Sequence, residues 1–237
     1  TGLILLEGPH LLAEAMAADL EVCKVYVQAA WAGTAEGARL LEAAREKGAE
    51  PVEVTPAFLS RAAATETPPP VLATARPPSA SRQASVRRLG LVVDGLQDPG
   101  NLGAILRVAW GAGADAVYAA PGTVDFYAPK VLRAGQGAHF HLDLRETGRD
   151  ELLAAVRREG WHLVATEAAA AVPLWRARLE RPCLVCIGNE ARGIGADFLA
   201  AAEERVAVPL APGVDSLNAA VTAGIVLFEL VRRGGGF

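Results

Sequence analysis

The stretch Arg205-Val206-Ala207-Val208-Pro209-Leu210-Ala211-Pro212-Gly213-Val214-Asp215-Ser216-Leu217-Asn218 decides how the rest of the chain is interpreted. Its first half, to Leu210, has the composition of a strand, and a Pro-Gly turn follows. Residues 216–233 then form a helical pattern that is apolar nearly all round, which is typical of a helix buried in a core or against a partner. Polar Ser216 and Asn218 in its first turn indicate either a capped buried helix or a ligand site at the helix N-terminus.

The composition is that of a folded protein. Hydrophobic residues make up 51% of the 237 residues, which is enough for a sizeable core. The net charge of −4 means that nucleic-acid binding would need a local patch rather than bulk charge. The longest apolar runs are shorter than the roughly 18 residues that a membrane span requires, so we expect no membrane segment. Glu7 interrupts the apolar run at 3–6, which has no basic flank, so we expect no signal peptide.

The three cysteines are Cys23, Cys183 and Cys186. A zinc site would need more Cys or His at suitable spacing, so we expect no metal. The Cys183–Cys186 pair lies in a strand-like apolar run, which indicates buried free thiols. Free thiols in turn predict a reducing compartment, the cytoplasm.

Strand and helix patterns alternate along the chain and divide it into an N-terminal and a C-terminal domain. Residues 1–76 are predicted to form a small α/β domain, and the Pro-, Ser- and Arg-rich stretch at 77–87 a linker. The alternation in 88–237 predicts a mostly parallel sheet with helices on both faces. The predicted strands are 3–6, 22–28, 51–54, 89–93, 116–120, 139–144, 162–166, 183–187 and 206–210, and the predicted helices are 8–19, 34–47, 101–112, 128–135, 150–159, 194–204 and 216–233.

The only three asparagines of the chain, Asn101, Asn189 and Asn218, each follow a predicted strand of the C-terminal domain. Asparagine is common in turns and caps in general. However, parallel sheets bind ligands at the carboxyl ends of their strands, so we predict that the three residues share a site. Arg107 is the only charged residue between Asn101 and Ala114. It is either a solvated surface residue or a ligand contact beside the small Gly103, one helical turn earlier.

Motifs of several other enzyme classes are missing or incomplete. The Gly188–Gly193 stretch has the spacing of a phosphate-binding loop but lacks the Lys-Ser/Thr that should follow, and no G-x-G-x-x-G fingerprint follows the first strand. A hydrolase elbow of the form G-x-S-x-G is also missing. His139 and His141 would share one face of the strand predicted at 139–144, and such a pair is more often structural than catalytic.

Three ordered motifs resemble those of the SpoU (TrmH) family of RNA ribose 2′-O-methyltransferases, part of the SPOUT superfamily. They are Asp94–Ala109, Leu184–Ile194 and Val208–Asn218. The segment Ala128–Ala138 also resembles the family, with Gly135 where members usually have Ser. Residues 1–75 more weakly resemble the small substrate-binding domain of many members, which is similar to a ribosomal-protein RNA-binding fold.

The resemblance implies a deep trefoil knot in the C-terminal domain, a homodimer, and S-adenosylmethionine as cofactor. The positions that match the family's active site are Asn101, Arg107, Glu190, Ser216 and Asn218. The positions that match its cofactor site are Thr166, Gly188, Val208, Leu210 and Leu217. Candidate contacts to RNA phosphate are Arg107, Lys130, Arg133 and Arg192, although the last three are equally consistent with solvated surface charge.

The implied reaction is in-line transfer of a methyl group to a ribose 2′-hydroxyl. A guanidinium keeps its proton and is a poor base, so we expect Arg107 to clamp the target phosphate or the developing oxyanion. Proton loss would then go to phosphate or water. The N-terminal domain favours large-subunit ribosomal RNA as substrate. The alternatives are transfer RNA, a non-catalytic RNA-binding protein of the same fold, and a Rossmann-type dehydrogenase, which would need the missing dinucleotide fingerprint.

Overall fold

The structure is a computed structural model that describes residues 2–78 and 86–234. The chain forms two compact units, and each is described by itself. Unit 1 lies within Thr1–Ser79 and Phe126–His141, and unit 2 lies within Ala80–Asp125 and Leu142–Phe237. Most of the linker predicted at 77–87 therefore lies outside the described residues.

Unit 1 is built on a four-stranded sheet of order β1-β4-β2-β3. Strand β4 is antiparallel to β1 and β2, while β2 and β3 are parallel. The strands are β1 (Ile4–Glu7), β2 (Val22–Val27), β3 (Glu50–Glu53) and β4 (Val71–Ala75), and the helices are α1 (Pro9–Ala17), α2 (Ala29–Ala32), α3 (Ala35–Glu46) and α4 (Pro56–Ala62). The predicted elements of residues 1–54 are present within one or two residues, whereas α2, α4 and β4 were not predicted.

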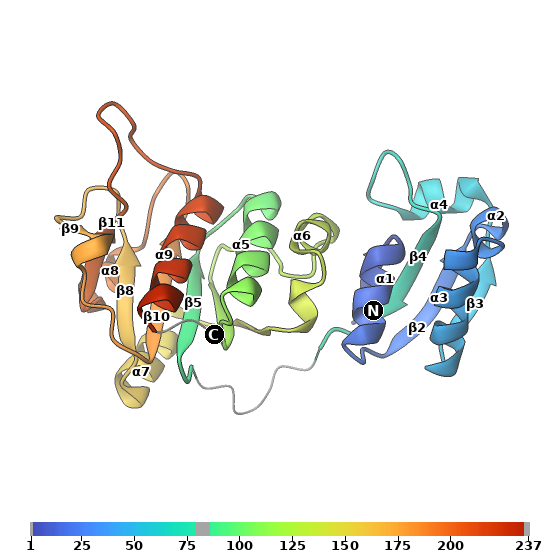
Figure 1. Ribbon diagram of the computed structural model, residues 1–237, viewed down its shortest axis with the longest axis horizontal. Helices are drawn as coiled ribbons and strands as arrows, with labels where there is room; N and C mark the ends of the chain where they lie inside the picture. Colours follow the sequence, from blue (N-terminus) through green and yellow to red (C-terminus); the bar gives the residue numbers. More distant parts are fainter. Residues whose placement is uncertain (1, 79–85, 235–237) are drawn as a thin grey trace. The chain divides into compact units, whose positions relative to one another are not determined.

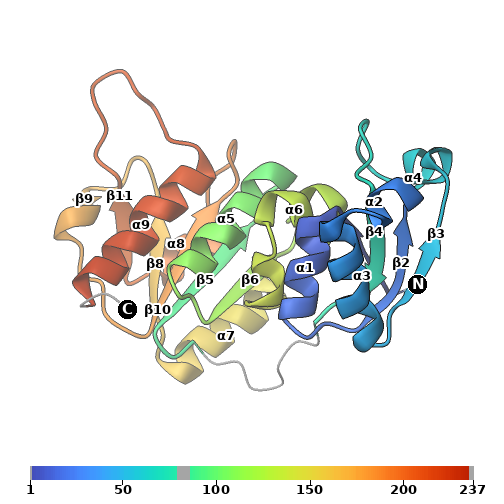
Figure 2. The ribbon, with the colours of Figure 1, turned by 45° about the vertical axis from the view of Figure 1, so that its right-hand side comes forward.

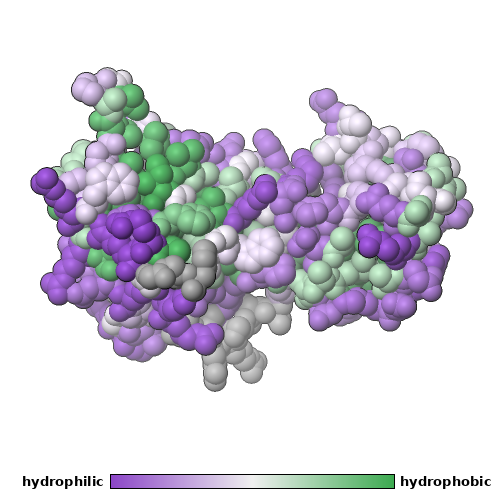
Figure 3. Space-filling view, viewed as in Figure 1, coloured by the Kyte–Doolittle hydropathy of each residue, from purple (hydrophilic) through white to green (hydrophobic). Residues whose placement is uncertain are grey.

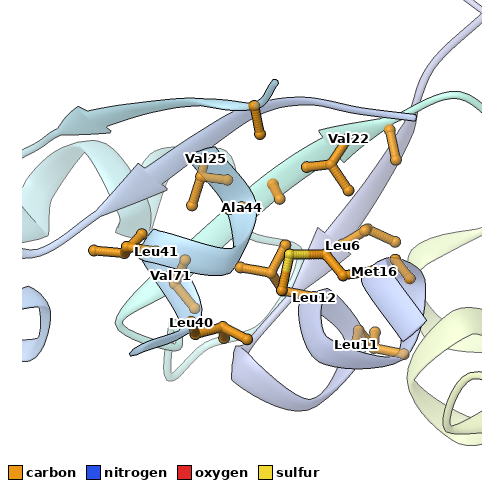
Figure 4. Close-up of a cluster of buried hydrophobic side chains, with 14 of the residues drawn as sticks. Leu6, Leu11, Leu12, Met16, Val22, Val25, Leu40, Leu41, Ala44 and Val71 are labelled. Atoms are coloured by element: carbon orange, nitrogen blue, oxygen red, sulfur yellow. The ribbon is translucent and has the colours of Figure 1, made fainter. Parts of the chain in front are cut away.

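The core of unit 1 lies between the sheet and the helices α1 and α3 (Figure 4). Helix α1 contributes Leu12 and Met16, and α3 contributes Leu41 and Ala44, in both cases at helical spacing. Burying one such leucine contributes roughly 1.5–3 kcal/mol, so these faces hold the unit together. Thr34 starts α3, because its Oγ1 accepts a hydrogen bond of 3.0 Å from the N–H of Gly37.

The segment Phe126–His141 belongs to unit 1 and contains α6 (Pro129–Gly135) and the 3₁₀ turn η1 (Ala138–Phe140). The strand predicted at 139–144 is therefore wrong for residues 139–142, because the strand begins only at Asp143. Gln136 and Gly137 both adopt positive φ angles, of 50° and 89°, which turn the chain out of α6 into the 3₁₀ turn. His139 is fully buried there and packs near Tyr127, so it does not share a strand face with His141.

Unit 2 is built on a seven-stranded sheet of order β7-β6-β5-β10-β8-β11-β9, in which every pair is parallel. The strands are β5 (Leu89–Asp94), β6 (Ala116–Ala120), β7 (Asp143–Glu146), β8 (His162–Thr166), β9 (Val172–Pro173), β10 (Cys183–Gly188) and β11 (Glu204–Ala207). The helices are α5 (Pro99–Gly111), α7 (Arg149–Glu159), α8 (Ala196–Ala201), α9 (Ala219–Arg233) and the 3₁₀ turn η2 (Leu174–Arg176). This confirms the predicted parallel α/β sheet.

Helices cover both faces of this sheet (Figures 1 and 2). Helices α5 and α9 pack together on one face, and α7 and α8 pack on the other. From β5 the chain first runs outward through β6 and β7 and later returns to the opposite side at β8. The order therefore reverses next to β5, and parallel sheets bind ligands near such a reversal, at the carboxyl ends of their strands.

Three predicted boundaries in and around β11 differ from the structure. Strand β11 ends at Ala207 rather than residue 210, since Pro209 has no N–H to donate to a ladder. Helix α9 begins at Ala219 rather than residue 216, because the Oδ1 of Asn218 accepts the N–H groups of Ala220 and Val221 at 2.9 and 3.3 Å. Helix α8 spans only Ala196–Ala201 of the predicted 194–204. None of the helices in the described ranges is long and apolar enough to cross a bilayer.

Candidate functional site

A pocket of about 250 Å³ opens at the carboxyl ends of β8, β10 and β11 in unit 2. Its lining includes two carboxylates, Glu167 and Glu190, and no lysine or arginine. This charge favours a cationic ligand over a phosphate. The lining residues are Thr166, Glu167, Ala168, Ile187, Gly188, Asn189, Glu190, Gly193, Val206, Val208, Leu210, Ser216, Leu217, Asn218, Ala219 and Thr222.

The structure brings together most of the residues that the sequence singled out. All five candidate cofactor residues line this pocket, and so do three of the five candidate active-site residues, Glu190, Ser216 and Asn218. Asn101 stands outside the lining but is hydrogen-bonded to two of its members. Arg107 is not part of the lining.

The pocket wall depends on two glycines after β10. A Cβ atom on Gly188 would lie 2.3 Å from the carbonyl carbon of Gly193, so no other residue fits there without moving the backbone. Gly193 has a φ of +69°, which favours glycine. Asn189 and Gly193 exchange backbone hydrogen bonds of 3.0 and 2.9 Å that close the loop. The main chain of this loop is therefore packed tightly against the end of β10.

A directed chain of hydrogen bonds joins the three motif loops beside the pocket. The Nδ2 of Asn218 donates to the Oδ1 of Asn101 at 2.8 Å. The Nδ2 of Asn101 in turn donates to the Oε1 of Glu190 at 2.8 Å. The N-cap of α9, the first turn of α5 and the loop after β10 are thereby joined by a series of hydrogen bonds that ends on a carboxylate.

The third asparagine, Asn189, shapes its own loop. Its Oδ1 accepts the N–H groups of Ala191 and Arg192 at 2.9 and 3.0 Å, and its Nδ2 donates to the carbonyl of Gly95 at 2.8 Å. Asn189 thus ties the loop after β10 to the end of β5. The predicted convergence of the asparagines is a direct contact for two of them and a loop tie for the third.

The candidate cations have different surroundings. Arg107 is exposed on α5, and no hydrogen bond or ion pair holds its guanidinium among the described residues. Lys130 and Arg192 are also exposed. Arg133, in contrast, forms an ion pair of 3.0 Å with the buried Glu7 of unit 1, so its charge is neutralised within the fold.

The pocket residues that sequence reasoning missed include two with polar side chains, Glu167 and Thr222. Glu167 directly follows β8, and a charged residue at the carboxyl end of a parallel strand is the signal that could have revealed it. Thr222 lies one turn after Asn218, so a correct start of α9 would have placed it on the pocket side.

The strand behind the pocket carries neutral thiols. Burial raises the pKa of Cys183 to about 12 and the pKa of Cys186 well above its ordinary value. The hydroxyl of Thr166 donates to the carbonyl of Cys186 at 3.0 Å, which fixes the Thr166 side chain at the pocket wall. Within the described ranges, no group of three or more His, Cys, Asp or Glu side chains is arranged to hold a metal ion.

Comparison with known proteins places both parts of the chain. The model of the SpoU rRNA Methylase family matches residues 88–228, and that of an MRM3-like substrate binding domain matches residues 1–73. The chain is 34% identical to an uncharacterized tRNA/rRNA methyltransferase of Synechocystis sp., over 98% of this chain and 85% of the relative. It is 30% identical to the 23S rRNA (guanosine(2553)-2′-O)-methyltransferase RlmP of Bacillus subtilis, over 97% of this chain and 89% of the relative.

Solved structures agree with these matches. The SpoU methyltransferase AviRb from Streptomyces viridochromogenes, solved in complex with AdoMet, has a TM-score of 0.88 at 27% identity, covering 100% of this chain and 92% of that one. An RNA 2′-O ribose methyltransferase has a TM-score of 0.84 at 33% identity, covering 98% and 89%. The chain therefore belongs to the SpoU rRNA methylase family, whose methyl donor is S-adenosylmethionine.

Proposed function

We propose that this protein transfers the methyl group of S-adenosylmethionine to the 2′-hydroxyl of a nucleotide in ribosomal RNA. The observation that carries the proposal is the hydrogen-bond chain from Asn218 through Asn101 to Glu190, at the rim of the acidic pocket. The names of relatives support the choice of RNA, since RlmP acts on 23S rRNA.

The residues of the pocket fit this donor. S-adenosylmethionine supplies an electrophilic methyl group on a positively charged sulfur, and it also carries an ammonium group. The carboxylates of Glu167 and Glu190 suit both positive charges, and the lining contains no cation to repel them. Apolar Val208, Leu210 and Leu217 provide flat contact for an adenine ring, with Thr166 and the bare backbone of Gly188 beside them.

Each active-site residue then has a distinct role. The exposed guanidinium of Arg107 clamps the target phosphate and stabilises charge that develops on the 2′-oxygen. Asn101 and Asn218 hold each other in a fixed orientation and present the ribose in line with the donor. Ser216, in the pocket lining, hydrogen-bonds the ribose, and the 2′-proton leaves to phosphate or water.

The two parts of the chain divide the work. Residues 1–76 bind the RNA substrate, and residues 88–237 carry out methyl transfer. Residues 77–87 are the linker between these two domains. The match of residues 1–73 to a substrate binding domain supports this division. Among the candidate phosphate contacts, exposed Lys130 and Arg192 suit the role, whereas Arg133 is engaged by Glu7.

A homodimer is part of the proposal. The exposed face of α9 presents Val221 and Phe228, which are 50% and 47% exposed, and α5 presents Trp110, which is 40% exposed. Figure 3 shows apolar surface over α9. Such a patch on a folded domain is typical of an interface, and the two helices suit a second copy of the chain.

The trefoil knot and the cytoplasmic location also belong to the proposal. The chain leaves β11, rises as a long loop and returns to α9 (Figure 1), a path that is compatible with a threaded C-terminal segment. The free, buried thiols of Cys183 and Cys186 suit a reducing compartment.

The test is methyl transfer from labelled S-adenosylmethionine to separate fractions of ribosomal and transfer RNA. We expect the label in the ribosomal fraction. Label in transfer RNA instead would support the transfer-RNA alternative. Binding of donor and RNA with no transfer to either fraction would favour a non-catalytic RNA-binding protein.

A further inference from the structure

An ion pair between a buried carboxylate and a partly exposed guanidinium lies at the end of β5, outside the residues that line the pocket. The carboxylate of Asp94, 1% exposed, accepts hydrogen bonds from the Nη2 and Nε of Arg149 at 2.5 and 3.2 Å. Its second oxygen accepts the backbone N–H of Gly195 at 2.7 Å. One carboxylate thus joins the end of β5, the start of α7 and the loop after β10.

The loop that the carboxylate holds is a wall of the donor pocket. Gly195 lies two residues after Gly193, which lines the pocket and packs against Gly188. The other end of the same loop is tied to the same strand end, because Asn189 donates to the carbonyl of Gly95. The wall is therefore anchored at both ends to residues 94 and 95.

The contacts around Gly195 are tight. A Cβ atom on Gly195 would lie 3.1 Å from the Oδ2 of Asp94 and 3.5 Å from the Cζ of Arg149. The pair and the loop are therefore packed in direct contact, and a shift of Arg149 is passed to the backbone at 195. Neither charged residue itself lines the pocket.

An ion pair of this kind is weak evidence for stability, because desolvation of the Asp94 carboxylate offsets much of the attraction between the two charges. A carboxylate does supply something that an apolar side chain cannot, which is two acceptor oxygens with fixed directions. One oxygen of Asp94 faces the guanidinium and the other faces the Gly195 N–H. The pair therefore specifies where the loop backbone lies.

We infer that Asp94 and Arg149 are positioning residues for methyl-donor binding: their ion pair fixes the backbone at Gly195, and through it the pocket wall formed by Gly193 and Gly188. This inference rests on the pocket being the donor site. It assigns the two residues no contact with donor or RNA.

The test compares donor binding by the variants Asp94→Asn and Arg149→Gln with that of the wild-type protein. An amide has a single acceptor oxygen, so Asp94→Asn cannot serve both Arg149 and Gly195. We expect the Kd and KM for S-adenosylmethionine to rise about tenfold in both variants, while the Kd for RNA stays unchanged. Arg149→Lys keeps the positive charge but loses the paired N–H donors of the guanidinium. Its Kd for S-adenosylmethionine should therefore lie between those of Arg149→Gln and wild type.

The matched control is Asp115→Asn, the same chemical change near the opposite end of β5. The Oδ2 of Asp115 accepts the N–H groups of Arg87, Arg88 and Leu89 at 3.0, 2.7 and 3.1 Å, and Leu89 starts β5. This variant should lose stability without losing donor affinity. Hydrogen exchange without donor gives a second readout, because the amides of 193–195 should exchange faster in Asp94→Asn and Arg149→Gln but not in Asp115→Asn.

Lower melting temperatures with donor Kd and loop exchange equal to wild type would overturn the inference and leave a purely structural pair. If Asp94→Asn does not fold, Arg149→Gln decides, because the Arg149 side chain is 37% exposed and its loss is more easily tolerated. If the wild-type protein itself binds no S-adenosylmethionine, the assignment of the donor pocket fails first, and the inference fails with it.

Discussion

Asn218 and Asn101, 117 residues apart in the chain, share a hydrogen bond of 2.8 Å that fixes the orientation of both amides. The Oδ1 of Asn218 is already occupied by the N–H of Ala220, so its Nδ2 must face Asn101. Asn101 must then turn its own Nδ2 toward Glu190. The start of α9 thus fixes how the side chains of Asn218 and Asn101 point.

The variant Asn218→Asp separates two roles of this residue: capping of α9, and the hydrogen bond that its side-chain amide donates to Asn101. A carboxylate still caps α9, so the free energy of unfolding should change by less than about 0.5 kcal/mol. It cannot donate to Asn101, so kcat should fall about 100-fold. Denaturant titration and initial rates measure the two effects. The matched variant Asn218→Ala should also lose about 1 kcal/mol of stability. Full activity of Asn218→Asp would contradict a role in catalysis for the hydrogen bond between Asn218 and Asn101.

Arg107→Ala should abolish methyl transfer while donor binding persists, because the guanidinium lies outside the pocket lining. Arg107→Lys keeps the charge but cannot donate two parallel hydrogen bonds to a phosphate, so it should retain only part of the methyl-transfer rate. Calorimetry with S-adenosylmethionine and single-turnover rates provide the comparison. Equal loss of donor binding and turnover would refute the assignment of Arg107 to the RNA side of the reaction.

Arg133→Gln should behave as a stability mutation. It removes the partner of Glu7, whose side chain is 1% exposed and which also accepts the N–H of Ala64 at 2.8 Å. Because Arg133 itself is 30% exposed, we expect a loss of about 2 kcal/mol rather than the larger cost of a fully buried pair.

The control is exposed Lys130 on the same helix. Lys130→Gln should change stability by less than about 0.5 kcal/mol and lower the salt slope of RNA binding by about one. A stable Arg133→Gln variant with a reduced salt slope would show that Arg133 contacts phosphate after all.

Stability in acid should depend on Glu229 in the last part of α9. Hydrogen bonds from Arg232 and Arg233, at 2.8 and 2.7 Å, lower its pKa to about 2 despite its burial. A depressed folded-state pKa stabilises the fold above the unfolded value of about 4.3. That contribution is lost as the pH falls from there to about 2.

As the pH is lowered from about 5 to about 2.5, the melting temperature should therefore fall less steeply in Glu229→Gln than in wild type. Glu66→Gln, at an exposed carboxylate, should follow the wild-type slope. Identical slopes for all three proteins would contradict the assignment.

Much of unit 2 could be predicted from sequence, because its strands are short apolar runs that alternate with amphipathic helices. The same reasoning placed Asn101 and Asn218 at one sheet edge, and their contact follows from that topology. The periodicity of apolar residues does not predict where a helix or strand ends. The capping hydrogen bonds of Asn218 set the start of α9, and Pro209, which has no N–H to donate, lies beyond the end of β11.

Contacts between distant residues were the least predictable. The pairing of Glu7 with Arg133 joins residues 126 apart, and that of Asp94 with Arg149 joins residues 55 apart. Nothing local distinguishes these carboxylates from solvated ones. Arg133 was consequently expected to contact RNA. The strand predicted at 139–144 failed because the positive φ of Gly137 is not visible in an alternating apolar pattern.

The central claim is that this site methylates a ribose hydroxyl. Its most direct test is incubation of RNA with S-adenosylmethionine labelled in the methyl group, followed by digestion to nucleosides and mass spectrometry. We predict one labelled 2′-O-methylnucleoside with the wild-type protein and none with Arg107→Ala. Label on a base, or no label under conditions where the donor binds, would contradict the claim.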